Sequence, residues 1–218
     1  MNHLCQKYVW EVPVRVTHWV NFLAIIILSV TGLYIGEPRT LALEPSQYVM
    51  GWTRFIHFVA AYAFAVSVLA RIYWMFVGNR YASWREFFPI LTEQGHRNMM
   101  DTFKWYLFLT RKTPRTVGHN ALAGAAYAGI FLLYLVMNFT GFALYAQQAP
   151  QSLLYKLTAW MFILFSSQGV RLTHHLVMWI LIAFAIHHVY SSWLMDVKER
   201  GGVMSGIFSG YKTVRQKD

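Results

Sequence analysis

The sequence predicts an all-α membrane protein, a bundle of four transmembrane helices. Of its 218 residues, 56% are hydrophobic and only 13% are charged, about half the charged share of an ordinary soluble protein. The charged residues are also unevenly spread, because four long stretches contain no Asp, Glu, Lys or Arg. A helix needs about 20 apolar residues to cross a bilayer core, and each of these stretches is long enough to form most or all of one span.

The four stretches follow one another along a single predicted domain. The first covers residues 19–35, longer than the apolar core of a typical signal peptide and without a cleavage site at its end. The second covers residues 55–70, the third lies within residues 116–155, and the fourth covers residues 172–195. Allowing for their flanks, we expect spans at residues 18–35, 54–78, 118–145 and 171–195 of one domain that covers residues 1–218.

The basic residues predict the orientation of these spans. With four spans, residues 1–17, 79–117 and 196–218 share one side of the membrane and hold fourteen Lys or Arg, whereas the opposite loops hold four. Lys and Arg collect on the cytoplasmic side, so we expect both termini there, with an interfacial segment at 79–117 and a tail at 196–218. Membrane lipid, and not nucleic acid, then accounts for the net charge of +10.

Histidines are the main polar side chains with metal-binding chemistry inside the spans, where ionisable groups are rare and usually functional. In the fourth span, His174 and His188 are fourteen residues apart, which returns to within about 40° of the same helix face. The other pairings between the two ends of this span, which are twelve or thirteen residues apart, diverge by about 120–140°. The rise between His174 and His188 is about 21 Å, which predicts one histidine near each membrane surface.

The other helices supply a partner at each level. His18 begins the first span at the level of His188, and His57 begins the second at the level of His174. Two imidazoles that face each other from different helices are typical of an axial haem site, whereas zinc usually takes four ligands, or three and a water. The spans therefore predict two bis-histidine haem sites. A haem-free anchor or transporter whose histidines only pack between helices stays the distant alternative.

Three arginines precede predicted ligands by one helical turn. Arg15, Arg54 and Arg171 each stand three residues before a histidine, on the same helix face and nearer the water. A guanidinium there can bind a haem propionate. The alternative is that these side chains only extend their charged ends to the interface.

Several motifs resemble the di-haem cytochrome b subunits of membrane-bound nickel–iron hydrogenases, a family related to formate dehydrogenase gamma and cytochrome b561-like subunits. The resemblance covers nearly the whole chain, and its motifs are Arg15-Val16-Thr17-His18-Trp19, Arg171-Leu172-Thr173-His174-His175, Gly118-His119-Asn120, Met204-Ser205-Gly206 and Ser209-Gly210-Tyr211. It implies two haem b groups, an inner one on His18 and His188 and an outer one on His57 and His174. The family position of His187 is usually apolar, so the choice between His187 and His188 stays open.

The resemblance also implies a role in a respiratory chain of the bacterial inner membrane. An electron-transfer subunit of this kind carries electrons from a periplasmic hydrogenase, with a nickel–iron large subunit and an iron–sulfur small subunit, to quinone. The partners would activate hydrogen, since Cys5 is the single cysteine here. Alternatives are the cytochrome b subunit of a formate dehydrogenase or thiosulfate reductase, and a stand-alone cytochrome b561-like carrier.

Quinone is expected on the cytoplasmic half, where the third span begins. The amide of Asn120 can donate a hydrogen bond to a quinone carbonyl, and His119 can titrate near neutral pH. The alternative is that these two residues only cap the helix, because Asn is a favoured cap residue.

Overall fold

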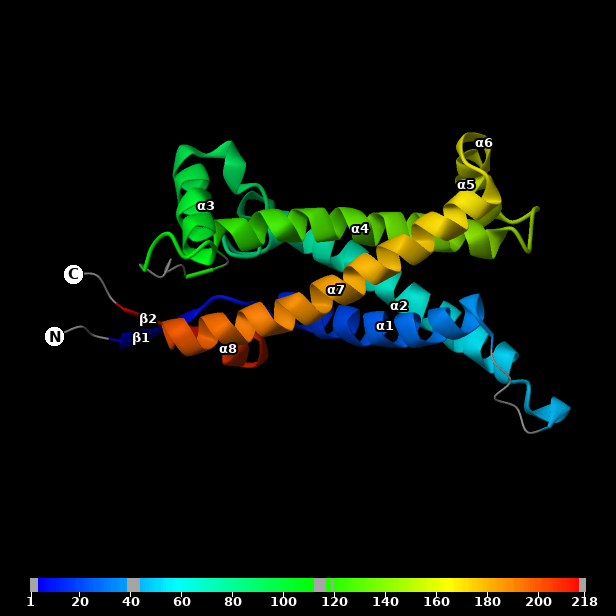
Figure 1. Ribbon diagram of the computed structural model, residues 1–218, viewed down its shortest axis with the longest axis horizontal. Helices are drawn as coiled ribbons and strands as arrows, with labels where there is room; N and C mark the ends of the chain where they lie inside the picture. Colours follow the sequence, from blue (N-terminus) through cyan, green and yellow to red (C-terminus); the bar gives the residue numbers. More distant parts are fainter. Residues whose placement is uncertain (1–3, 39–43, 112–116, 119, 216–218) are drawn as a thin grey trace. The chain divides into compact units, whose positions relative to one another are not determined.

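The computed structural model describes residues 4–38, 44–111, 117, 118 and 120–215, and most of them are helical. Among the described residues, four helices are long and apolar enough to cross a membrane, the same number as the predicted spans. They are α1 (Val12–Gly36), α2 (Val49–Val77), α4 (Ala121–Ala146) and α7 (Ser167–Glu199), all labelled in Figure 1.

The helices differ from the predicted spans mainly at their ends. α1 begins at Val12 and not at residue 18, and α7 continues to Glu199. A charge-free stretch marks only the part that suits the hydrocarbon core, whereas helical hydrogen bonding continues into the polar region on either side. Large apolar side chains such as Phe55, Val66 and Leu132 are more than half exposed on these helices, as expected of surfaces that contact lipid.

The chain separates into two compact units, and each long helix contributes a segment to both. Unit 1 comprises Met1–His18, Leu69–Phe131 and Ala185–Asp218, and unit 2 comprises Trp19–Val68 and Leu132–Phe184. Each unit is described by its own contacts below.

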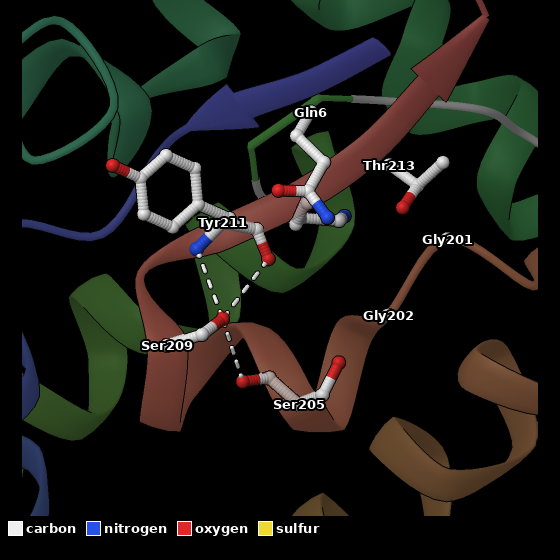
Figure 2. Close-up of a pocket in the computed structure, with 8 residues that line it drawn as sticks. Gln6, Gly201, Gly202, Ser205, Ser209, Tyr211 and Thr213 are labelled. Atoms are coloured by element: carbon white, nitrogen blue, oxygen red, sulfur yellow. Dashed lines mark hydrogen bonds between the residues drawn. The ribbon is translucent and has the colours of Figure 1, made fainter. Parts of the chain in front are cut away.

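In unit 1, the two ends of the described chain form a small antiparallel sheet (Figure 1). Strand β1 (Leu4–Tyr8) pairs with β2 (Tyr211–Arg215), and the short helix α8 (Val203–Ser209) leads into β2. Gly210 makes the turn between them with a φ of 90°, where a Cβ would lie 2.6 Å from the Tyr8 ring. Figure 2 shows the small cleft beside this turn, where the Ser209 hydroxyl accepts a hydrogen bond from the Tyr211 N–H.

Polar contacts hold the start of α1 to the end of α2 in the same unit. The carboxylate of Glu11 accepts hydrogen bonds from the Trp74 indole at 2.9 Å and from the backbone N–H of Asn79 at 2.7 Å. The Arg71 guanidinium donates to the Ala82 carbonyl at 3.2 Å and lies over the Phe87 ring. These contacts fix the chain where it leaves α2.

The predicted interfacial segment forms a series of short helices after that point. It contains η2 (Trp84–Glu86), η3 (Pro89–Leu91) and α3 (Glu93–Tyr106). The Thr92 hydroxyl caps α3 by accepting from the Gly95 N–H at 3.1 Å. Apolar side chains in and beside these helices, such as Leu91, are largely exposed, which is consistent with a position at a membrane surface.

Unit 2 contains the remaining parts of the long helices and two connecting loops. The loops include η1 (Pro45–Gln47), α5 (Leu153–Thr158) and α6 (Trp160–Leu164). Aromatic pairs pack α2 against α4, including Phe58 with Tyr145 and Phe64 with Tyr134, whose ring centroids are 4.4 and 5.0 Å apart. These contacts hold the helices that carry the polar groups of this unit.

Candidate functional site

Unit 1 brings two predicted ligands together. His18 on α1 and His188 on α7 face each other with ring centroids 6.2 Å apart and ring planes 54° apart. The Tyr127 hydroxyl of α4 lies 3.3 Å from Nδ1 of His188, and its ring packs edge-on against the same imidazole. His188 is half-buried whereas His187 is exposed, so the rotation of α7 presents His188 to His18.

Unit 2 holds the other two predicted ligands, His57 on α2 and His174 on α7. Both imidazoles are half-buried, and a Cβ added to Gly32 would lie within 4 Å of both His57 and Met178, which is one turn after His174 on α7. Each ring is also held by a threonine of another helix. Thr31 Oγ1 of α1 lies 2.8 Å from Nδ1 of His57, and Thr140 Oγ1 of α4 lies 2.9 Å from Nδ1 of His174.

Two glycines let these rings lie close to a helix backbone. A Cβ added to Gly32 would lie 3.3 Å from Cε1 of His57, and one added to Gly141 would lie 3.1 Å from Cε1 of His174. Both distances are shorter than an ordinary van der Waals contact between carbons. Each ring therefore occupies space that a side chain would otherwise take.

The donor groups of both units fit a haem iron with two axial imidazoles. Each unit supplies two histidines from different helices, and at His57, His174 and His188 a hydroxyl near Nδ1 leaves Nε2 as the ring nitrogen for a metal. Among the described residues, no group of three or more His, Cys, Asp and Glu side chains could hold another kind of metal ion. The residues thus suit haem better than zinc.

His175, which was not predicted to be a ligand, has a different environment. Its Nδ1 lies 3.0 Å from the Arg171 carbonyl. Its Nε2 lies against the end of α1, where a Cβ on Gly36 would approach within 2.6 Å. Both ring nitrogens are therefore placed against backbone.

The three predicted propionate ligands lie near helix ends. The Arg15 guanidinium donates to the carbonyl of Phe208 at the end of α8. Arg54 and Arg171 are exposed.

Of the two predicted quinone residues, His119 lies outside the described residues. Asn120 caps α4, because its side-chain oxygen accepts from the Ala123 N–H at 2.8 Å. Asn120 therefore acts as a helix cap through its side-chain oxygen.

Glu86 is a candidate proton carrier that the sequence did not reveal. A Cβ on Gly118, two residues before Asn120, would lie 3.8 Å from Oε2 of Glu86. Partial burial raises the pKa of the Glu86 carboxyl above its ordinary value, and nearby Arg80 opposes that shift. A glutamate in a charged loop resembles any solvated residue, so only its packing shows that it is unusual.

Comparisons with known proteins agree over almost the whole chain. A family model described as prokaryotic cytochrome b561 matches residues 9–210. A protein of Cupriavidus necator named "Probable Ni/Fe-hydrogenase B-type cytochrome subunit" is 43% identical over 217 residues, 95% of this chain and 87% of that protein.

A protein of the same name from Bradyrhizobium diazoefficiens is 41% identical over 213 residues, 95% of this chain and 86% of that protein. The "Probable Ni/Fe-hydrogenase 1 B-type cytochrome subunit" of Escherichia coli K12 is 36% identical over 220 residues, 97% of this chain and 93% of that protein. Such identity over nearly complete chains indicates common descent and a shared fold. The chain therefore belongs to the prokaryotic cytochrome b561 family, together with the B-type cytochrome subunits of Ni/Fe hydrogenases.

Proposed function

We propose that this chain is the di-haem subunit that anchors a periplasmic Ni/Fe hydrogenase to the inner membrane and carries its electrons to quinone. The observation that carries the proposal is the presence of one pair of histidines from different helices in each unit. A single pair would supply one electron carrier near one surface, whereas two pairs on helices that cross the membrane provide a path between surfaces.

Four histidines would hold the haem groups. His18 and His188 would bind the inner iron, and His57 and His174 the outer one, each through Nε2. When bound, each haem b accepts and releases one electron at a time, at a potential that its ligands and their hydrogen bonds adjust. The protein orients the imidazoles and buries them partly, while Arg15, Arg54 and Arg171 would neutralise propionates.

The proposed orientation is one domain of four spans with both termini in the cytoplasm. Pairing of β1 with β2 supports a common side for the two termini, as an even number of spans requires. The hydrogenase subunits would then dock on the opposite loops, where the exposed side chains of Leu153, Leu157 and Ile163 offer an apolar surface. We assign this contact to the iron–sulfur small subunit, with the nickel–iron large subunit beyond it.

The function is tested on membranes that contain the complete complex. Hydrogen should convert the haem b of this chain from the ferric to the ferrous form, which its absorbance spectrum reports. Formate or thiosulfate should leave the redox state unchanged. In the same membranes, a photo-crosslinker at Lys156 should capture the small subunit, and one at Lys104 in α3 should not. Reduction by formate would favour the alternative dehydrogenase, and capture only from Lys104 would reverse the orientation.

Quinone is proposed to bind beside the start of α4, near Gly118, His119 and Asn120. Asn120 uses its side-chain oxygen as a cap, which directs its two amide hydrogens elsewhere. Reduction of a quinone also consumes protons, and Glu86, with its raised pKa, holds a proton at higher pH than an exposed glutamate would.

Changing Asn120 to Asp tests this site, since the variant keeps an oxygen that can cap α4 but loses the amide donor. We expect both haems to be retained and hydrogen-dependent quinone reduction to slow by about tenfold, equivalent to about 1.4 kcal/mol for the lost hydrogen bond. The measurement is the steady-state rate with a soluble quinone, normalised to haem. Normal turnover in Asn120→Asp would mean that Asn120 only caps α4 and does not bind quinone.

A further inference from the structure

The same pair of residues, Thr followed by Gly, faces a histidine twice in unit 2. Thr31 and Gly32 of α1 contact His57, and Thr140 and Gly141 of α4 contact His174. We propose that Thr31 and Thr140 are positioning residues that fix the tautomer and orientation of the outer haem ligands. This inference rests on the proposed role of His57 and His174 as ligands.

The direction of each hydrogen bond follows from what the threonine does with its single hydrogen. Thr31 Oγ1 donates to the carbonyl of Ile27 at 2.6 Å, and Thr140 Oγ1 donates to the carbonyl of Val136 at 2.7 Å. A hydroxyl has one donor hydrogen, so toward histidine each oxygen acts as an acceptor.

The histidine must then be the donor. Nδ1 of His57 and of His174 carries the hydrogen, and the lone pair of the neutral ring lies on Nε2. This is the tautomer that an axial ligand bound through Nε2 requires. Thr31 and Thr140 thus select the binding form of each ring before iron is present.

The glycines restrict the same rings sterically. Cε1, the atom nearest to the Cβ positions of Gly32 and Gly141, lies between the two ring nitrogens. The hydroxyl therefore holds one edge of the imidazole while the adjacent backbone supports the neighbouring atom, so rotation of the ring would break one contact or the other.

A threonine bonded to the carbonyl four residues earlier is common in helices, so that feature alone would mean little. Thr53 of α2, for example, donates to the Val49 carbonyl at 2.8 Å. What distinguishes Thr31 and Thr140 is the imidazole at hydrogen-bond distance on the other side of the oxygen. Its occurrence on two separate helices, each time next to glycine, supports a common role.

The arrangement should also affect the redox potential. An acceptor at Nδ1 makes an imidazole a more basic ligand, which favours ferric over ferrous iron. Removal of the acceptor should therefore shift the midpoint potential of the outer haem to a more positive value. The inner haem, which would take its ligands His18 and His188 from unit 1, should keep its potential.

The test uses the complete complex with Thr31→Val or Thr140→Val, which retain the branched shape but lose the acceptor. At a fixed ambient potential, we expect the ferrous-to-ferric ratio of one haem to rise about tenfold, or 59 mV for one electron. Potentiometric titration of the haem absorbance measures this shift. Thr31→Ser and Thr140→Ser should restore the potential, and Thr53→Val is the matched control that should leave it unchanged.

The outcomes separate this inference from the proposed function. Unchanged potentials in both valine variants, with one haem lost in His57→Ala, would overturn the positioning role and leave the ligands intact. Two haems in His57→Ala would overturn the proposed ligand. If a valine variant loses haem, retention of haem in the matching serine variant supports the hydroxyl, and loss in both overturns it.

Discussion

Replacing His174 with alanine should remove one of the two haem groups, and replacing His175 should remove neither. Each proposed iron takes two imidazoles from the same unit, so loss of one ligand leaves a site that binds haem weakly. The rings of His175 and His187 are placed differently, because His175 contacts backbone at both nitrogens and His187 is exposed. Haem-to-protein stoichiometry in each purified variant is the measurement.

Double variants make the assignment sharper than single ones. His57→Ala combined with His174→Ala should lose no more haem than either alone, because both changes affect one site. His18→Ala combined with His174→Ala should lose both haems, because the changes affect separate sites. If His188→Ala retains two haems, His187 and not His188 is the ligand of the inner haem. Loss of haem in His175→Ala would contradict the argument that only His174 and His188 share the ligand face of α7.

The sequence predicted the helices well because the bilayer imposes a simple rule on it. A spanning helix must be apolar for about 20 residues, and this constraint is visible in the charge-free stretches without knowledge of tertiary contacts. The same regularity predicted that His174 and His188 share a face, since helical geometry is the same in every helix. The structure brings the rings of His18 and His188 together in unit 1.

Contacts between helices were not predictable, because the sequence does not state how each helix is rotated about its axis. Consecutive residues point about 100° apart, so although His188 shares a helix face with His174, only packing shows toward which neighbour that face turns. For the same reason the threonines that face His57 and His174 could not be identified. They are separated from those histidines by 26 and 34 residues. A threonine in a helix ordinarily donates its hydroxyl hydrogen to a backbone carbonyl of the same helix, with no partner on another helix.

The ends of the chain were also beyond sequence reasoning. β1 and β2 are five residues each and pair across almost the whole length of the chain. Strands so short carry little periodic signal, and their pairing depends on where the helices bring them. The basic residues of the tail therefore predicted only the side of the membrane on which it lies, whereas α8 and β2 became apparent only in the structure.

Gly124 of α4 packs closely against the backbone of Glu86 in unit 1, and changing it to alanine should lower stability by about 3 kcal/mol, at the upper end of the usual cost of overpacking. A Cβ at this position would overlap the carbonyl oxygen of Glu86 and lie 3.3 Å from its carbonyl carbon. These are backbone atoms, so the strain cannot be relieved by turning a side chain. The next residue, Phe87, is buried and packs edge-on against Phe131, which limits movement of the segment.

Gly129 provides a matched control on the same helix. A Cβ there would meet nothing within 4 Å, and Ala is favoured over Gly in a helix interior by about 1 kcal/mol. We therefore expect Gly129→Ala to preserve or raise the unfolding midpoint in detergent, and Gly124→Ala to lower it. The fraction of helical circular dichroism lost on heating or in denaturant measures both. Equal midpoints for the two variants would mean that α4 and the loop at Glu86 can separate without cost, and that the close approach at Gly124 does not hold the start of α4 beside Glu86.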